Sequence, residues 1–363
     1  MEIRKKKMNH SRRLKVAHVL KSSVYSGAEN VAITIIRNLS SEFECTYIAS
    51  DGPIRDILEK ESIPFILLDS FDRRSLSDAV RQCLPDIVHA HDFSATVLCA
   101  SLKGKFRLIS HLHHAPPWVT TWNMRTLVYA ACRTRIESLL AVSQKSFDSM
   151  VFAKCFQDKM LTVGNPIDAA KIKEMASMTI PDSGDRRYDL VFVGRFVEPK
   201  NPQRFIRLVA ALRDSGWFDI QTCMIGSGDL MHECRELVEA LQLQENIEIK
   251  GFQKNPYPYI KNAKLLCITS RWEGFGLVAI EANMLGVPVL STDNAGCSEI
   301  LGEEAPEICR SDEEFLEKIW LLKHSDEEYS SWKARSVVRG RSFDNIETYM
   351  ANMACIYRNE VTN

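Results

Sequence analysis

The chain has 363 residues, of which 45% are hydrophobic and 26% charged, and this length allows two globular domains. Its formal net charge of −1 offers no bulk positive charge for nucleic acid, and no apolar run approaches the roughly 20 residues that cross a bilayer. The basic N-terminus is not followed by the apolar core of a signal peptide, and the eleven cysteines include no CxxC pair, so we expect a cytoplasmic protein with reduced thiols.

Short apolar strands alternate with amphipathic segments through the first half of the chain. Residues 14–20 predict a buried strand, a small-residue turn with Ser26 and Gly27 follows, and a helical stretch comes next. The intervening segments are long enough for crossover helices, which predicts a doubly wound α/β unit with a mostly parallel sheet. Further strands are expected at 45–50, 63–68, 86–90, 107–112, 138–142 and 160–163.

The alternation breaks around 164–188, where a turn at 164–168 precedes a polar stretch at 178–187 that contains Pro and Gly, and a second α/β series follows. Its apolar residues place expected strands at 189–193, 220–225, 246–250, 265–269 and 287–291. The tail at 344–360 carries apolar residues at helical spacing. We therefore predict a basic arm at 1–13, one domain at 14–177, a second at 178–343, and a final helix within 344–363.

Polar motifs follow the strands of the second series, where doubly wound sheets bind their ligands. Arg195 and Lys200 come after one strand and could neutralise a diphosphate, although such residues are often a solvated basic loop. The stretch 265–300 has a glycine-containing turn, a helix start suited to phosphate, and the carboxylates Glu273 and Glu281. The Gly226–Gly228 pair fits a tight turn and a ligand approach equally well.

Five of the nine histidines lie within 26 residues of the first half, at positions 89, 91, 111, 113 and 114. Imidazoles are common metal ligands, but no carboxylate or thiol stands at a supporting spacing such as HExxH. We therefore expect one or two of them to line a binding site as hydrogen-bond donors, while the others pack or face solvent.

Several strings resemble the retaining GT-B glycosyltransferases of glycosyltransferase family 4, namely VGRFVEPKN, MIGSGDL, EGFGLVAIEANMLGVPVLSTDNAGCSEIL and SFDNIETYM. Glu273 and Glu281 match the family's Glu-x7-Glu signature. SGAENVAITIIRNL resembles the first glycine loop, with Ser26 where a second glycine is usual, and GNPID resembles the interdomain turn, with Pro166 in place of glycine. The resemblance spans residues 14–360. It implies two Rossmann-like domains facing across a cleft, with a C-terminal helix that packs back toward the first domain.

The resemblance also implies residue roles in a donor site. Arg195 and Lys200 match the basic pair that holds the donor diphosphate. Glu281 matches the acceptor of the ribose hydroxyls, and Glu273 matches the glutamate that faces the transferred sugar.

In the string ISHLHH, His113 aligns with the family histidine that lines the donor sugar, and His111 and His114 are the other candidates. The remaining matches are positions around the donor: Gly27, Gly194, Gly226, Gly251, Phe252, Gly274, Phe275, Gly276 and Leu277.

A family member of this kind would move a sugar from a nucleotide sugar to a glycan or lipid-linked acceptor, in cell-surface polysaccharide or lipopolysaccharide synthesis. A UDP-sugar is the first expectation for the donor and GDP-mannose the second. Retention is implied to proceed by same-face attack, with the leaving phosphate accepting the proton, so no dedicated base is expected. No Asp-x-Asp motif is present, and we expect neither a metal nor a cofactor. A nucleotide-sugar 2-epimerase and an inactive scaffold subunit are the alternatives.

The first domain carries basic and aromatic residues that could rest on the inner face of a membrane. They lie in the arm at 4–15, at 103–107 and in WVTTWNMRTLVYAACRTR at 118–135. An ordinary amphipathic helix with a disordered basic tail explains the same residues equally well.

Overall fold

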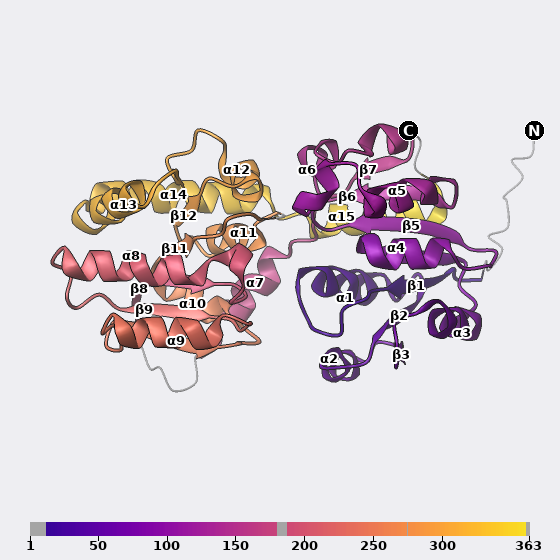
Figure 1. Ribbon diagram of the computed structural model, residues 1–363, viewed down its shortest axis with the longest axis horizontal. Helices are drawn as coiled ribbons and strands as arrows, with labels where there is room; N and C mark the ends of the chain where they lie inside the picture. The colour runs from indigo at the N-terminus through magenta and orange to yellow at the C-terminus, as the bar shows by residue number, and fades with distance from the viewer. Residues whose placement is uncertain (1–11, 180–186, 274, 361–363) are drawn as a thin grey trace, which may run out of the picture. The chain divides into compact units, whose positions relative to one another are not determined.

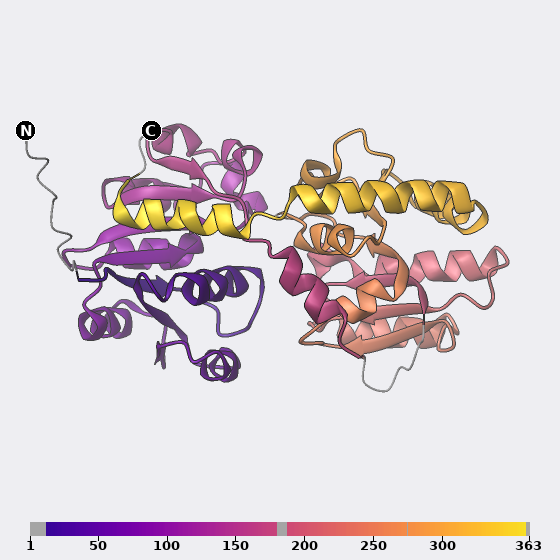
Figure 2. The same cartoon turned by 180° about the vertical axis from the view of Figure 1, so that it is seen from behind.

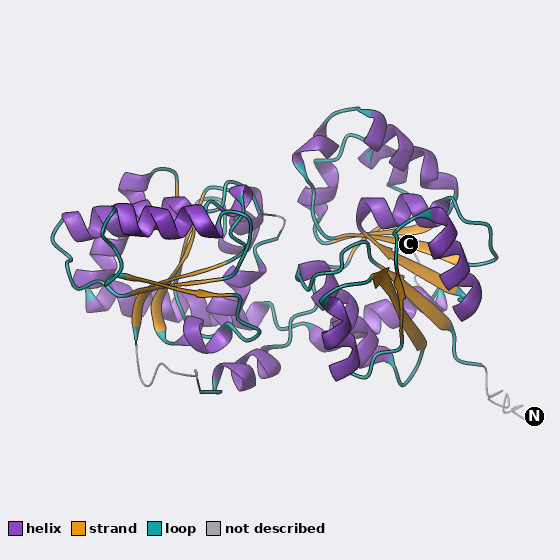
Figure 3. Cartoon of the chain, turned by 60° about the horizontal axis from the view of Figure 1, so that its bottom comes forward, coloured by secondary structure: helices purple, strands orange, loops and turns teal. Residues whose placement is uncertain are grey.

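The computed structural model describes residues 12–179, 187–273 and 275–360, which form two compact units. The first unit comprises Met1–Pro166 and Ile346–Asn363, and the second comprises Ile167–Asn345. In each unit, helices cover both faces of a parallel sheet (Figure 3). Each unit is therefore a doubly wound α/β layer structure, as the alternation of strands and helical segments predicted.

The first unit is coloured indigo to magenta in Figure 1, apart from the yellow α15, and is built on seven parallel strands in the order β3-β2-β1-β4-β5-β6-β7. The strand order reverses between β1 and β4, so the carboxyl ends of these two strands mark the expected ligand position. The strands are β1 (Lys15–Val19), β2 (Glu44–Ser50), β3 (Phe65–Leu68), β4 (Ile87–His91), β5 (Arg107–Leu112), β6 (Ile136–Ala141) and β7 (Met160–Thr162). The helices are α1 (Gly27–Leu39), α2 (Ile54–Lys60), α3 (Arg73–Cys83), α4 (Asp92–Ala100), α5 (Met124–Ala131), α6 (Gln144–Asp148) and α15 (Ile346–Arg358), with the 3-10 turns η1 (Pro117–Thr120), η2 (Cys132–Thr134) and η3 (Ala153–Phe156).

Two apolar clusters cover the opposite faces of this sheet. Alternate residues such as Ile87 and Ile109 pack under α1 and α15, whereas Val88 and Leu108 pack under α3, α4 and α5. Figure 2 shows α15, in yellow, lying across the first unit. Because successive side chains of a strand point to opposite faces of the sheet, neighbouring residues pack against two different sets of helices.

The second unit has six parallel strands in the order β10-β9-β8-β11-β12-β13. They are β8 (Tyr188–Val193), β9 (Thr222–Ile225), β10 (Ile247–Gly251), β11 (Ala263–Ile268), β12 (Val289–Thr292) and β13 (Ile308–Cys309). The helices are α7 (Ala169–Ala176), α8 (Pro202–Asp214), α9 (Met231–Ala240), α10 (Tyr257–Lys261), α11 (Leu277–Met284), α12 (Ala295–Leu301), α13 (Asp312–His324) and α14 (Asp326–Ser342), with the 3-10 turn η4 (Glu198–Lys200). All the predicted strands are present, whereas β13 was missed because two residues give no periodic signal.

The division between the units corrects the boundary that the sequence suggested at residues 177 and 178. The first unit ends at Pro166, and α7 belongs to the second unit, because Ile172 packs with Tyr259 and Ile260 of α10. At the other end, the second unit extends to Asn345, whose side-chain oxygen accepts the Ile167 N–H at 3.0 Å. Within the described ranges, no helix has both the length and the apolar character that crossing a membrane requires.

Candidate active site

Lys200 and Glu273 form an ion pair at the carboxyl ends of two neighbouring strands of the second unit. Lys200 ends η4 in the loop after β8, and Glu273 lies in the loop after β11. The Lys200 Nζ donates to Glu273 Oε1 at 2.6 Å and to Oε2 at 2.5 Å, and the Ser270 Oγ donates to Oε1 at 2.6 Å. The Glu273 side chain is 7% exposed and the Lys200 side chain 25% exposed. The carboxylate is therefore held by three hydrogen bonds, while part of the ammonium stays open to solvent.

Hydrogen bonds to backbone carbonyls hold these two loops together. The Arg271 N–H donates to the Pro199 carbonyl at 2.8 Å, and the Thr269 hydroxyl donates to the Asn201 carbonyl at 3.0 Å. On the other side, the backbone of Glu273 lies so close to Gly296 of α12 that a Cβ on Gly296 would come within 2.9 Å of the Glu273 carbonyl oxygen. The site is thus built from tightly packed backbone, and Gly296 is required for that close approach.

The helix α11 begins next to this pair, as predicted. Its N-cap is Gly276, whose φ of +71° lies in the left-handed region that glycine adopts without strain. The first-turn N–H groups of a helix have no intrahelical partners and form its positive end. The Tyr257 hydroxyl donates to Glu281 Oε1 at 3.2 Å. Burial raises the pKa of Glu281 to about 7, and the Tyr257 hydrogen bond offsets part of this rise.

Glycines close the loops after β8, β9 and β10. The Gly194 N–H donates to the Ile225 carbonyl at 3.0 Å, and the Gly226 N–H donates to the Gly251 carbonyl at 2.9 Å. Gly226 has a φ of +136°, and a Cβ there would lie 1.9 Å from the Gly194 oxygen. The close approach of the backbone is therefore sufficient to explain glycine at position 226. This corresponds to the tight turn, which was one of the two interpretations of the sequence beside a ligand approach.

The other predicted donor positions differ in exposure. Arg195 is exposed, with no side-chain hydrogen bond or ion pair to any other described residue, and Phe252 is 59% exposed. Phe275 and Leu277 are half-buried against the apolar core. Gly274 lies outside the described residues. The structure thus brings Lys200, Glu273 and the start of α11 into one site and leaves Arg195 free to reach a ligand.

Gly27 and His113 belong to the first unit, where each follows a central strand. Gly27 is exposed at the start of α1 after β1, and half-buried His113 follows β5. The His113 N–H donates to Asp92 Oδ1 at 3.2 Å, and His114 Nδ1 lies 3.4 Å from the same oxygen. Burial alone would raise the pKa of Asp92, but the hydrogen bond from His114 and the neighbouring His113 hold that pKa below its ordinary value.

Asp92 has a φ of +68°, which is uncommon for a residue other than glycine. Such backbone strain concentrates at functional sites. The strained backbone at Asp92 therefore indicates a candidate functional site at the edge of the first sheet where His113 lies. Of the three histidines in ISHLHH, His111 is fully buried on β5, so only His113 and His114 lie at that edge.

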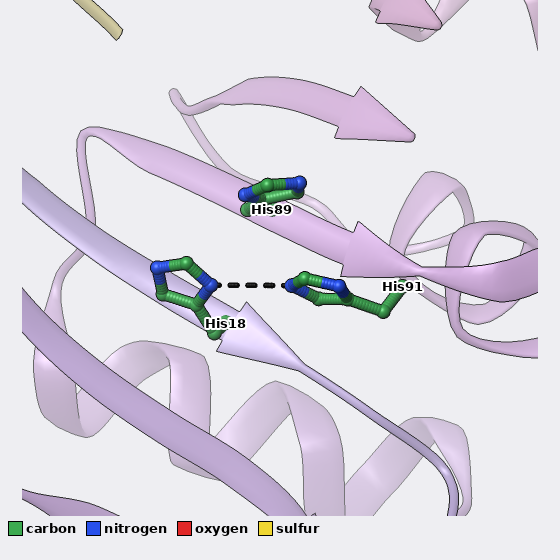
Figure 4. Close-up of side chains that lie close together, drawn as sticks. All are labelled: His18, His89 and His91. Carbon is green, nitrogen blue, oxygen red and sulfur yellow. Dashed lines mark hydrogen bonds between the residues drawn. The ribbon is translucent and has the colours of Figure 1, made fainter. Parts of the chain in front are cut away.

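A buried histidine cluster lies beneath this edge. One ring nitrogen from each of His18, His89 and His91 lies within 4.8 Å of the others (Figure 4), and the same is true of His91, His111 and His113. These are the groups of side chains in which an imidazole-bound metal could be sought. Most of their ring nitrogens already have hydrogen-bond partners, so these histidines form a hydrogen-bonded network.

Sequence reasoning missed several residues of these sites. Ser270 lies two residues after the end of β11, and Asp92 directly follows the end of β4, so position just after a strand was the available signal. Tyr257 and Tyr357 act across the fold, the second through a hydrogen bond to His89, and no local pattern links either to its partner.

Two family models match consecutive parts of the chain. The model described as Glycosyltransferase Family 4 matches residues 25–171, and the model described as Glycosyl transferases group 1 matches residues 177–337. The two matches divide close to the junction of the two units and together cover most of the chain.

Curated relatives share modest identity with the chain. An N-acetylgalactosaminyltransferase of Campylobacter jejuni, named for an N,N'-diacetylbacillosaminyl-diphospho-undecaprenol acceptor, is 27% identical over 187 residues, which are 50% of this chain and 49% of that protein. A UDP-Gal:alpha-D-GlcNAc-diphosphoundecaprenol alpha-1,3-galactosyltransferase of Escherichia coli is 23% identical over 325 residues, covering 80% of this chain and 82% of that protein. The chain spans about half the length or less of the first two curated relatives that it matches.

Solved structures share the architecture. The Anabaena protein HepE in complex with UDP-glucose superimposes with a TM-score of 0.80 at 19% identity, over 96% of this chain and 100% of that chain. At this level of identity, the likeness shows the fold.

Proposed function

Because this chain belongs to glycosyltransferase family 4 and has the two-domain α/β GT-B fold, we propose that it is a retaining glycosyltransferase. In this proposal it moves a sugar from a nucleoside diphosphate to a hydroxyl of a glycan or lipid-linked glycan, in cell-surface polysaccharide synthesis. The observation that carries the proposal is the Lys200–Glu273 pair beside the start of α11. This arrangement places a cation, a carboxylate and a positive helix end on one sheet edge.

The donor diphosphate would bind at the start of α11. Free N–H groups and the helix dipole favour a phosphate at this position. Glu273 holds Lys200 in the free chain, so an arriving diphosphate competes with the carboxylate for that ammonium. In this proposal Glu281, which lies on α11, accepts the ribose hydroxyls when it is ionised.

The reaction requires stabilisation of the leaving group. Departure of the nucleoside diphosphate leaves an oxocarbenium-like sugar and adds negative charge to the phosphate. Lys200 and the exposed Arg195 would stabilise that charge. The acceptor attacks on the face from which the phosphate leaves, and the departing phosphate takes the acceptor's proton. This route uses no metal and no dedicated protein base.

A UDP-sugar is the favoured donor. HepE was solved with UDP-glucose, and the relative from E. coli is named for UDP-Gal, so two similar proteins point to uridine. GDP-mannose is the second candidate.

A lipid-linked acceptor is supported by the relatives named for diphospho-undecaprenol substrates. The first unit also exposes a cluster of apolar side chains at the start of α5: Trp122 is 52% exposed, Met124 74%, Leu127 52% and Val128 44%. We propose that this cluster rests on an anionic membrane. Arg125 can supply charge there, whereas Arg133 is already paired with Asp158 at 2.6 Å.

The donor assignment can be tested by thermal denaturation with a panel of UDP-sugars and GDP-mannose, since a ligand of the native state raises the apparent stability. A UDP-sugar should raise the midpoint, and transfer should continue in the presence of EDTA. Epimer formation without a glycoside product would show a 2-epimerase, and no response to any donor would indicate a scaffold. Arg195→Ala and Lys200→Ala should depress turnover with the fold intact, so near-normal turnover would refute their role.

The membrane contact can be tested by co-sedimentation with anionic and neutral vesicles. Met124→Ser and Leu127→Ser should reduce binding to anionic vesicles. Phe218→Ser is the matched control, because Phe218 is 74% exposed but lies in the second unit. Absence of vesicle binding by the unaltered chain would remove the proposal.

A further inference from the structure

Five histidines share one face of the first sheet. His18 lies on β1, His89 and His91 on β4, and His111 on β5, with His113 just after β5; the strands place His18 beside His89 and His91 beside His111. The spacing of two residues keeps each pair on the same face, the one that α1 and α15 cover. On this face, Ile87 and Ile109 form an apolar layer near the amino ends of the strands, and imidazoles follow toward the carboxyl ends.

These imidazoles and one tyrosine form an unbranched chain of hydrogen bonds. Figure 4 shows part of it, with a ring nitrogen of His18 pointing at one of His91. From one end to the other, the contacts are His111 Nδ1 to His89 Nε2 at 3.2 Å, His89 Nδ1 to Tyr357 OH at 2.7 Å, Tyr357 OH to His18 Nε2 at 3.4 Å, His18 Nδ1 to His91 Nε2 at 3.1 Å, and His91 Nδ1 to His113 Nε2 at 2.8 Å. The two terminal nitrogens, His111 Nε2 and His113 Nδ1, are buried and have no partner among the described residues.

All five imidazoles are neutral at neutral pH. Burial lowers the pKa of His18 to about 3 and that of His113 to about 4, the second despite the nearby Asp92 carboxylate. Burial and the neighbouring imidazoles also hold the pKa values of His89, His91 and His111 well below the ordinary value. Each ring therefore carries one proton, on Nδ1 or on Nε2.

The number of protons limits how the chain can be arranged. Five neutral imidazoles and one hydroxyl supply six protons for five contacts. The hydroxyl has one proton, so it donates to one histidine and accepts from the other. One proton is then left over, and it must lie at one end of the chain, on His113 Nδ1 or on His111 Nε2.

The geometry couples the tautomers of all five rings. Each histidine–histidine contact joins an Nδ1 to an Nε2, and Tyr357 likewise faces Nδ1 of His89 and Nε2 of His18. If His113 carries its proton on Nδ1, its Nε2 must accept from Nδ1–H of His91, and the same requirement passes along the whole chain. The five histidines are therefore all Nδ1–H or all Nε2–H.

One feature favours the Nδ1–H arrangement. It places the spare proton on His113, beside the negatively charged Asp92 carboxylate, which accepts the main-chain N–H of His113 at 3.2 Å. A neighbouring negative charge favours an N–H donor over a bare acceptor nitrogen. Burial does not distinguish the two arrangements, because each leaves one buried terminal N–H without a partner among the described residues.

We infer that this chain acts as one cooperative unit, which holds all five histidines in the same tautomer and keeps the spare proton on His113 Nδ1. His18, His89, His91, His111 and Tyr357 are then positioning residues for His113, and Asp92 sets the direction of the chain. Metal binding is the competing use of these residues, but eight of the ten ring nitrogens are already hydrogen-bonded within the chain.

Nuclear magnetic resonance of the protein with isotope-labelled histidine tests the inference, because the ring-nitrogen shifts distinguish the two neutral tautomers. Single His→Gln variants assign the signals, and the exposed His232 serves as the internal reference. All five should be neutral Nδ1–H tautomers at neutral pH. A mixture of tautomers, a protonated ring, or a metal bound in stoichiometric amount would overturn the inference.

The coupling is tested by Asp92→Asn, since asparagine tolerates the positive φ and still accepts the main-chain N–H of His113. Loss of the charge removes the preference for Nδ1–H, so all five histidines should shift together toward a mixture of the two arrangements, with the same Nε2–H fraction at every ring. In the double variant Asp92→Asn, Tyr357→Phe, the link between His18 and His89 is gone, so His18, His91 and His113 should share one fraction while His89 and His111 share another. A change confined to His113, or no change at all in Asp92→Asn, would overturn the inference whether or not the protein transfers sugar.

Discussion

Glu273 and a donor diphosphate compete for the same ammonium, and this competition predicts opposite effects of two substitutions on UDP binding. In Lys200→Met, the diphosphate loses a charge-assisted contact worth about 1.5–3 kcal/mol, so the Kd for UDP should rise about 10- to 100-fold. In Glu273→Gln, Lys200 no longer has the carboxylate that holds it at 2.5–2.6 Å. Releasing a partly exposed pair should free about 0.5–1.5 kcal/mol for the ligand, which tightens UDP binding about 2- to 10-fold.

UDP is the informative ligand because it carries no sugar, so the proposed contact of Glu273 with the transferred sugar does not affect the result. Titration calorimetry with each variant gives the Kd directly. Lys264→Met is the matched control. Lys264 also pairs with a carboxylate, Asp189 at 3.0 Å, but it lies near the amino end of β11, away from the loops that hold the site.

The two variants also differ in stability. Lys200→Met leaves Glu273 with only the Ser270 hydroxyl as a side-chain donor, and such an under-paired buried group costs about 1–3 kcal/mol of the free energy of unfolding. Binding is therefore measured at a temperature where circular dichroism shows the variant fully folded. Unchanged UDP affinity in Lys200→Met, or weaker UDP binding in Glu273→Gln, would refute the competition.

Two further predictions follow from single positions. The folded pKa of Glu281 is raised from 4.5 to about 7, so the stability that its protonated form provides is present below the unfolded pKa and is lost as the pH rises through 7. Glu281→Gln should therefore raise the free energy of unfolding above pH 7 by about 1–2 kcal/mol, measured by urea denaturation. The same substitution should weaken UDP binding. Equal stability of the variant and the unaltered protein above pH 7 would contradict the burial of the Glu281 carboxylate. Gly226→Ala should cost about 2 kcal/mol or more of the free energy of unfolding and so lower the unfolding midpoint, because the new Cβ meets the Gly194 oxygen and the φ of +136° is strained. Gly216→Ala is the control, since a Cβ at that position meets no atom within 4 Å. Equal midpoints for the two variants would contradict the close approach at Gly226.

The local architecture was largely predictable because it is encoded by local patterns. Buried strands gave continuous apolar runs, and glycine-containing turns after strands located the start of α11. The predicted domain boundary at residue 177 lies after the observed one at residue 166. The prediction relied on polar composition, whereas the boundary is determined by packing, and Ile172 packs in the core of the second unit.

The site was predictable to the extent that its residues stand at strand ends. Lys200 and Glu273 were both identified, but their direct pairing was not, since 73 residues separate them in the chain. The histidines at 89, 91, 111 and 113 were noticed as a cluster, and their spacing of two residues could have shown that they share a sheet face. The two remaining members, His18 and Tyr357, lie 339 positions apart, and only the fold brings them together.

Formation of a glycosidic bond with retained configuration tests the central claim most directly. The chain would be incubated with a UDP-α-sugar and a diphospholipid-linked or free glycan acceptor, and the anomeric configuration of the product read by nuclear magnetic resonance. The account predicts an α-linked product, with UDP released in equal amount and with strongly reduced yield in Lys200→Ala. A β-linked product, or release of UDP without a glycoside, would contradict it.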